Sequence, residues 1–337
     1  METLWFALIA VMIAAYVVLD GFDLGAGIVY LLVARNDSDR RTVLKSIGPF
    51  WDGNEVWLLA AGGTLYFAFP VLYASSFSGF YLPLMMVLWL LILRGLSLEM
   101  RSHIDVDLWK HFADAIFALS SSLLAIFFGA ALGNVIRGVP LNTDGYFFLP
   151  LWTNFTPQHE AGVLDWYTVP VGAAAFAVLM FHGALWVAYK TEGEVQTRAR
   201  ALADRLRWLV VALTVVVLGL SALVQPRAIR GAWLLPLAAI SLAVAGWLSK
   251  SDRTRFLASC GFIAAMLAGA VLGVYPYVLP SNGDPALGLT IYNASAAPYG
   301  LSVGLKWFIP GIILAAGYFF YVYRSFAGKV RMENEGY

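Results

Sequence analysis

The sequence from Gly48 to Trp57 is GPFWDGNEVW, and it opens an apolar run that continues to Pro70. Two carboxylates and two tryptophans therefore stand at the start of a hydrophobic segment. A second acidic pair, Asp20 and Asp23 in the string DGFDLG, interrupts the apolar run before it. Because a charge is costly to bury among apolar groups, each of these four carboxylates requires a partner or a function.

The composition places these strings in a membrane protein. Of the 337 residues, 60% are hydrophobic and only 13% are charged, whereas soluble proteins carry roughly a quarter charged residues. Mean hydropathy is +0.74. Apolar runs of about eighteen or more residues recur, and that length is needed to cross roughly 30 Å of hydrocarbon. Since the runs are continuous, they predict an all-α polytopic membrane protein. The net charge of +1 gives no sign of a nucleic-acid partner.

We expect nine transmembrane helices in a single integral membrane domain over residues 1–337. The expected spans are Leu4–Val33, Trp51–Tyr73, Phe80–Leu98, Ala113–Ile136, Val163–Tyr189, Trp208–Val224, Trp233–Leu248, Phe256–Val278 and Gly304–Tyr323. Glu2 directly precedes the first apolar residues, without the basic region of a signal peptide, so the first run is expected to be a retained span. The longer outer segments, 137–162 and 279–303, are expected to be capping loops.

Lysine and arginine predict the orientation of these spans. Most of the 22 Lys and Arg residues fall in the loops after spans one, three, five, seven and nine. Short loops rich in Lys and Arg remain in the cytoplasm. We therefore expect the N-terminus outside and the C-terminus inside a bacterial or archaeal plasma membrane.

The expected orientation brings the acidic residues to similar depths within residues 16–101. At 1.5 Å per residue, Asp20 lies about 20 Å and Asp23 about 15 Å from the inner end of span one. Asp52 is expected near the inner edge of span two, with Glu55 about one turn deeper. Span three brings Arg94 to a similar depth. Because consecutive helices joined by short loops usually pack together, we expect one cluster of four carboxylates around Arg94.

Two interpretations of this cluster stay open. Several carboxylates in a low dielectric cannot all be ionised, so Asp20, Asp23, Asp52 and Glu55 could share protons in an uptake path that opens to the cytoplasm. Trp51, Asn54, Arg94 and Glu99 are then the supporting neighbours. Alternatively, the cluster is a buried salt-bridge network around Arg94 that fixes helix packing. Trp51 could likewise line a quinone or a haem edge, or anchor the helix at the membrane boundary.

Metal and haem ligands are scarce in the sequence. Of the four histidines, only His182 falls within an expected span. A bis-histidine haem would need a second, and a lone histidine in a bundle more often bonds a neighbouring helix. No Cys/His cluster with metal spacing occurs. Two function classes fit these features: a redox-complex subunit whose partner holds the cofactors, and a proton-coupled secondary transporter. Crowding of the acids into the first third of the chain disfavours the transporter, which would show repeated halves.

The strings DGFDLG (20–25), GPFWDGNEVWL (48–58) and AAGGTLYFAFPVLYASSFSGFY (60–81) closely resemble subunit II of the cytochrome bd-type quinol oxidases. The resemblance continues more weakly through GNVIRGVP (133–140) and covers most of the chain. It implies two four-helix bundles plus a peripheral helix. Glu55 departs from the family pattern, which has Gln at this position.

The resemblance also implies cofactors and partners. In that family a haem-bearing subunit I holds low-spin haem b, high-spin haem b and haem d, together with the quinol site. A small single-span subunit sometimes joins the pair, and a structural quinone and membrane lipid are further expected ligands. Subunit II ligates no haem or metal. By motif, Asp20 and Asp52 are similar to acids on the family's proton path, and Trp51 is placed to shape a quinone or the haem environment. The implied activity is quinol oxidation and O2 reduction, electrogenic without proton pumping.

Overall fold

The computed structural model describes residues 1–157 and 160–330. The helices of the first half are α1 (Glu2–Val33), α2 (Asp37–Ile47), α3 (Trp51–Ala68), α4 (Pro70–Gly79), α5 (Tyr81–Met100) and α6 (Asp107–Arg137). Those of the second half are α7 (Thr168–Lys190), α8 (Gly193–Val224), η1 (Pro226–Leu234), α9 (Leu235–Ala243), η2 (Val244–Leu248), α10 (Asp252–Val274), η3 (Pro285–Leu287) and α11 (Pro298–Ser325). Two short antiparallel strands, β1 (Tyr277–Leu279) and β2 (Leu289–Thr290), pair between α10 and α11.

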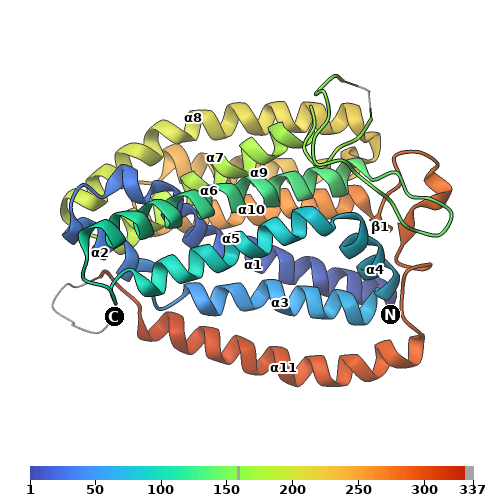
Figure 1. Cartoon of the computed structure of the whole chain (residues 1–337), viewed down its shortest axis with the longest axis horizontal. Coiled ribbons are helices and arrows are strands. Elements are labelled where there is room, and N and C mark those ends of the chain that lie inside the picture. Colours follow the sequence, from blue (N-terminus) through green and yellow to red (C-terminus); the bar gives the residue numbers. More distant parts are fainter. Residues whose placement is uncertain (158–159, 331–337) are drawn as a thin grey trace.

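The expected all-α membrane architecture is confirmed. Within the described residues, eight helical segments are long and apolar enough to span a membrane, and the bent pair α3–α4 makes a ninth. Figure 1 shows the long helices side by side along the longest axis. We call the end that carries α2 and the start of α3 the basic end. The opposite end, where the segments 138–157, 160–167 and 275–297 lie, is the loop end.

The second span differs from the expected Trp51–Tyr73. α3 stops at Ala68, and α4 leaves it at an angle of 119°. The break follows from Pro70, which has no N–H to donate and keeps the preceding Phe69 out of the helical region (φ −133°, ψ 66°). Eighteen residues of α3 still make about 27 Å, close to the hydrocarbon thickness.

The expected sixth span, Trp208–Val224, starts too late compared with the observed helix α8. α8 begins at Gly193 instead of Trp208, so arginines expected in a loop lie on a helix. One face of this basic extension is apolar and buried, with Val195, Ala199 and Ala203 at helical spacing. Its other face forms ion pairs, for example Arg198 with Asp39 of α2 at 2.6 Å.

Limits of other helices also moved, and α10 begins at Asp252 instead of Phe256. α6 begins at Asp107 instead of Ala113, and α11 at Pro298 instead of Gly304. α7 begins at Thr168 instead of Val163, and α10 ends at Val274 instead of Val278. Proline is favoured at the first position of a helix, which accounts for the earlier start of α11.

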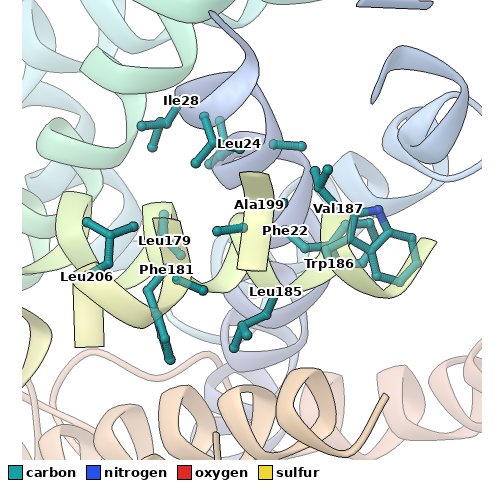
Figure 2. Packing of buried hydrophobic residues seen from close by; sticks show 14 of the residues in the cluster. Phe22, Leu24, Ile28, Leu179, Phe181, Leu185, Trp186, Val187, Ala199 and Leu206 are labelled. Carbon is teal, nitrogen blue, oxygen red and sulfur yellow. The ribbon is translucent and has the colours of Figure 1, made fainter. Parts of the chain in front are cut away.

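The crossing of α1 with α7 forms the centre of the core (Figure 2). Gly25 and Gly183 bring the two backbones together, since a methyl group added at either would overlap the backbone of the other helix. Phe22 stacks on Trp186 with ring centroids 3.9 Å apart. Gly62 and Gly63 of α3, in contrast, have no neighbour within 4 Å of an added methyl group.

The loop end is closed by the two expected caps packed on each other. Val139 donates to the carbonyl of Pro280 at 3.0 Å and accepts from Asn282 at 3.1 Å. α11 then runs along the outside of α3 (Figure 1) and contacts it mainly through aromatic pairs, such as Trp57 with Phe319 at 5.4 Å. Within α11 only Leu301 is buried, so it is a peripheral helix.

Candidate functional site

Arg94 is the centre of a buried ionic cluster. It lies on the face of α5 that meets the bundle, and its side chain is completely buried. Both terminal nitrogens bond the carboxylate of Asp20 on α1, at 3.0 Å and 2.5 Å. Nη1 also donates to Glu55 of α3 at 2.9 Å. Three neighbouring helices are thus joined by one guanidinium, and Asp20 is as deeply buried as Arg94.

A second arm of the site begins at Asp23. Although Asp23 lies one turn from Asp20, it does not contact Arg94 and accepts instead from the amide of Asn54 at 2.7 Å. The oxygen of that amide accepts from the hydroxyl of Tyr323 on α11 at 3.0 Å. Asp23 Oδ1 and Arg94 Nε are buried without a hydrogen-bond partner among the described residues.

The periodicity of α3 decides which of its polar residues enter the site. Asn54, Ala61 and Ala68 recur every seven residues and form the buried stripe of this helix. The opposite stripe, which contains Asp52 and Leu59, is exposed. Glu55 lies between the two stripes and is 25% exposed. The expectation that all four carboxylates surround Arg94 therefore fails for Asp52, which lies on the exposed stripe, and for Asp23, which bonds Asn54 instead.

The remaining expected neighbours lie at the edge of the site. The Trp51 ring packs against Gly95 of α5, where an added methyl group would touch it. Glu99 is exposed, and only its backbone carbonyl makes a hydrogen bond, with the ring of His103. Neither side chain enters the contacts around Arg94.

His182 is engaged on both sides of its ring. Nδ1 lies 2.7 Å from the hydroxyl of Ser259, and Nε2 lies 3.0 Å from the carbonyl of Val18. Neither nitrogen is directed at an open position, so the geometry of His182 does not fit a haem ligand. Across residues 1–157 and 160–330, His, Cys, Asp and Glu form no group of three that could hold a metal ion.

Comparison with known proteins identifies the family. The family model for cytochrome bd terminal oxidase subunit II matches residues 1–326. This chain belongs to that family. Subunit 2 of the cytochrome bd ubiquinol oxidase of Bacillus subtilis (strain 168) is 29% identical, with 96% of each chain covered. Subunit 2 of the cytochrome bd-I ubiquinol oxidase of Escherichia coli (strain K12) is also 29% identical, over 98% of this chain and 95% of that one.

A solved structure supports the same architecture. The bd oxidase from Geobacillus thermodenitrificans matches with a TM-score of 0.74 and 18% identity, over 97% of this chain and 98% of the matched chain. At this identity the likeness shows the fold. Family membership makes the chain a subunit of a terminal oxidase, which is an oxidoreductase, and disfavours the transporter alternative.

The structure also shows a second ionic cluster that we did not expect from the sequence of this bd-family chain. Asp114 of α6 is buried at the basic end, where it accepts from the hydroxyl of Tyr30 at 2.5 Å and from Arg40 at 2.9 Å. Arg101 bonds the same carboxylate and also donates to Asp37 of α2 at 2.9 Å. This last bond lowers the pKa of Asp37. The signal in the sequence was Asp114 at the very start of an apolar run, the same pattern that singled out Asp52.

Proposed function

We propose that this chain is the haem-free second subunit of a bd-type quinol oxidase, and that it scaffolds a haem-bearing subunit I. The family match over residues 1–326 carries this proposal. His182 has both ring nitrogens engaged, so the haems and the chemistry of quinol and O2 belong to the partner. This chain contributes the surface on which that partner assembles, in a bacterial plasma membrane.

The exposed apolar surface supports a docking face on α3, α5 and α11. In the most apolar stretch of α11 no residue is buried, and in those of α5 and α8 only 11% of residues are, compared with 72% in α7. α3 buries only Asn54, Ala61 and Ala68, so α3, α5 and α11 all leave most of their surface uncovered. Exposed large side chains on them include Leu59, Trp89 and Trp307.

We further propose that the cluster around Arg94 passes protons from the cytoplasm to the partner subunit. Asp20 and Glu55 share one guanidinium and Asp23 lies one turn from Asp20, so the cluster can hold protons without losing its buried ion pair. Buried polar atoms without a protein partner, such as Asp23 Oδ1, are usually satisfied by water, which would connect the two arms. Glu55 opens to the proposed docking face and is the exit of this route.

The positive-inside rule gives the direction of uptake. The basic end carries Arg40 and Arg41 of α2 and four more arginines in the first turns of α8, so by this rule it faces the cytoplasm. Asp52 stands at this end on the exposed stripe of α3. It is therefore a candidate for collecting protons at the surface, separate from the buried relay.

Two measurements test these proposals. The tagged chain is purified from native membranes and its reduced-minus-oxidised spectrum is recorded; the scaffold proposal fails if no second large subunit and no haem b or d bands co-purify. In the assembled complex, Asp23→Asn should still accept the hydrogen bond from Asn54 but carry no proton, so quinol oxidase turnover should fall about tenfold or more.

The matched control for the second measurement is Glu194→Gln. Glu194 is an exposed carboxylate in the first turn of α8, at the same end of the bundle but outside the cluster. Its turnover should equal that of the unmodified complex. Normal turnover in Asp23→Asn with intact haem bands would return Asp23 to a purely structural role.

A further inference from the structure

A basic pocket lies at the basic end, where α8, η2 and the start of α10 meet. Its volume is about 270 Å³, near the lower end of ligand pockets. Nine residues line it: Arg200, Asp204, Arg207, Gly246, Trp247, Ser249, Lys250, Asp252 and Arg255. It shares no residue with the cluster around Arg94 or with the docking face.

Two arginines of the pocket are neutralised by its two acids. Arg200 bonds both oxygens of Asp252, at 2.8 Å and 2.5 Å. Arg255 bonds Asp204 at 2.7 Å. Arg207 also lies 3.9 Å from the carboxylate of Asp204, so four cations share two acids and the pocket keeps a net positive charge. Lys250 is outside every ion pair among the described residues.

Arg207 is held in place by the backbone and by two aromatic rings. Its Nη1 donates to the carbonyl of Gly246 in the π turn η2 at 2.8 Å. Its guanidinium carbon lies 5.0 Å from the ring centre of Trp247 and 5.8 Å from that of Trp208. Its Nε is buried and has no partner among the described residues. Because two rings and a carbonyl fix the guanidinium, unused donors are presented to a ligand at little entropic cost.

The surroundings of the pocket belong to a membrane boundary. Trp208 and Trp247 pack edge to face with centroids 5.1 Å apart, and tryptophan is enriched where hydrocarbon meets headgroups. Trp208 and its neighbours Leu209 and Leu248 are exposed apolar side chains. The basic pocket therefore continues directly into an apolar surface along α8 and α9.

We propose that this pocket binds the headgroup of an anionic phospholipid. Arg207 and Lys250 would contact the phosphate, and the acyl chains would lie on the exposed apolar surface of α8 and α9. Basic pockets between spans on the cytoplasmic side recognise anionic lipid headgroups in this way. A free phosphate ion would use the same two cations but would gain nothing from the apolar surface.

Lipid binding to the purified, delipidated complex tests the proposal. Native mass spectrometry measures the affinity for dioleoyl phosphatidylglycerol, with dioleoyl phosphatidylcholine as the uncharged comparison. Lys250→Glu should weaken binding of phosphatidylglycerol about tenfold or more, since it replaces an attraction with a repulsion. Lys250 is exposed and makes no hydrogen bond or ion pair among the described residues, so this change leaves the fold intact. Arg207→Gln should weaken binding in the same direction.

The matched control is Arg253→Glu. Arg253 is an exposed cation three residues from Lys250 that does not line the pocket, and its reversal changes the net charge equally. Its affinity for phosphatidylglycerol should equal that of the unmodified complex. The proposal is overturned by an equal loss in both variants, by equal binding of the two lipids, or by displacement of the lipid with excess inorganic phosphate.

Discussion

Arg94 and Asp20 are both fully buried, so removing one charge leaves the other unpaired at membrane depth. Arg94→Gln should therefore lower the free energy of unfolding by about 3–5 kcal/mol. Asp20→Asn should cost less, because Glu55 still faces the guanidinium. The melting temperature of the assembled complex measures both effects.

The double variant Arg94→Gln/Asp20→Asn separates charge from packing. If the buried charge is the cause, the double variant should melt above Arg94→Gln alone. Arg205→Gln serves as a control, since Arg205 is exposed on α8 and outside the cluster. A double variant that melts at or below Arg94→Gln would mean that lost packing, and not the unpaired carboxylate, explains the single change.

Asp37 gives a pH-dependent contribution outside the membrane. The hydrogen bond from Arg101 lowers its pKa in the folded protein below the usual value of roughly 3.9. Because the pKa of Asp37 is lower in the folded than in the unfolded protein, its ionised form stabilises the fold at pH values above the unfolded pKa. That stability is lost as the pH falls through the folded pKa. Asp37→Asn should thus lower the melting temperature by a small constant amount above about pH 5, and the difference should shrink towards zero as the pH falls through the folded pKa.

Melting curves across this range of pH check the effect of Asp37, which is modest because the side chain is 47% exposed. Asp144→Asn is the control. Its side chain is exposed at the loop end and makes no hydrogen bond or ion pair with any described residue. If the difference in melting temperature between Asp37→Asn and the unmodified protein persists unchanged in acid, the ion pair is not its source.

At this scale the sequence located the acidic site but not its contacts. Rarity of charge in apolar runs was enough to single out Asp20, Glu55 and Arg94. The contacts depend on helix rotation, which spacing alone does not fix. Asp52 lies one turn from Glu55, yet the stripe that begins at Asn54 turns it outward.

The crossing of α1 and α7 depends on Gly25 and Gly183, whose backbones touch. Gly183→Ala should force the helices apart and lower the free energy of unfolding by at least about 1–3 kcal/mol. Gly219→Ala on α8 is the matched control, because nothing lies within 4 Å of the added methyl group. That change should be neutral or stabilising by up to about 1 kcal/mol. The melting temperatures of the two variants test this prediction. Equal melting temperatures would contradict the close crossing of α1 and α7.

Hydrophobic length predicted which segments cross the membrane but not where their helices end. α8 begins fifteen residues before the apolar run, because buried Val195 and Ala199 and ion pairs to α2 and α10 stabilise a polar extension. The bend at Phe69 could be anticipated from Pro70 only as a break. Its angle of 119° depends on where α4 packs, which is a tertiary property.

The whole molecule is asymmetric in what it buries. α7 lies in the middle of the bundle, whereas α3, α5 and α11 leave one side open. The cluster around Arg94 lies directly beneath that open side. A partner docked there would cover Glu55 and receive protons over a short distance, so scaffold and relay would use the same surface.

A bulky apolar change separates a docking face from a lipid-facing one. Leu59 on α3 is 74% exposed and Leu223 on α8 is 78% exposed, and tryptophan at either site remains compatible with lipid. Leu59→Trp should disrupt the packed interface and reduce the amount of haem-bearing subunit that co-purifies with the tagged chain. Leu223→Trp should leave it unchanged. If both variants retain the partner equally, subunit I does not dock on this side of α3, and the route through Glu55 has no receiver there.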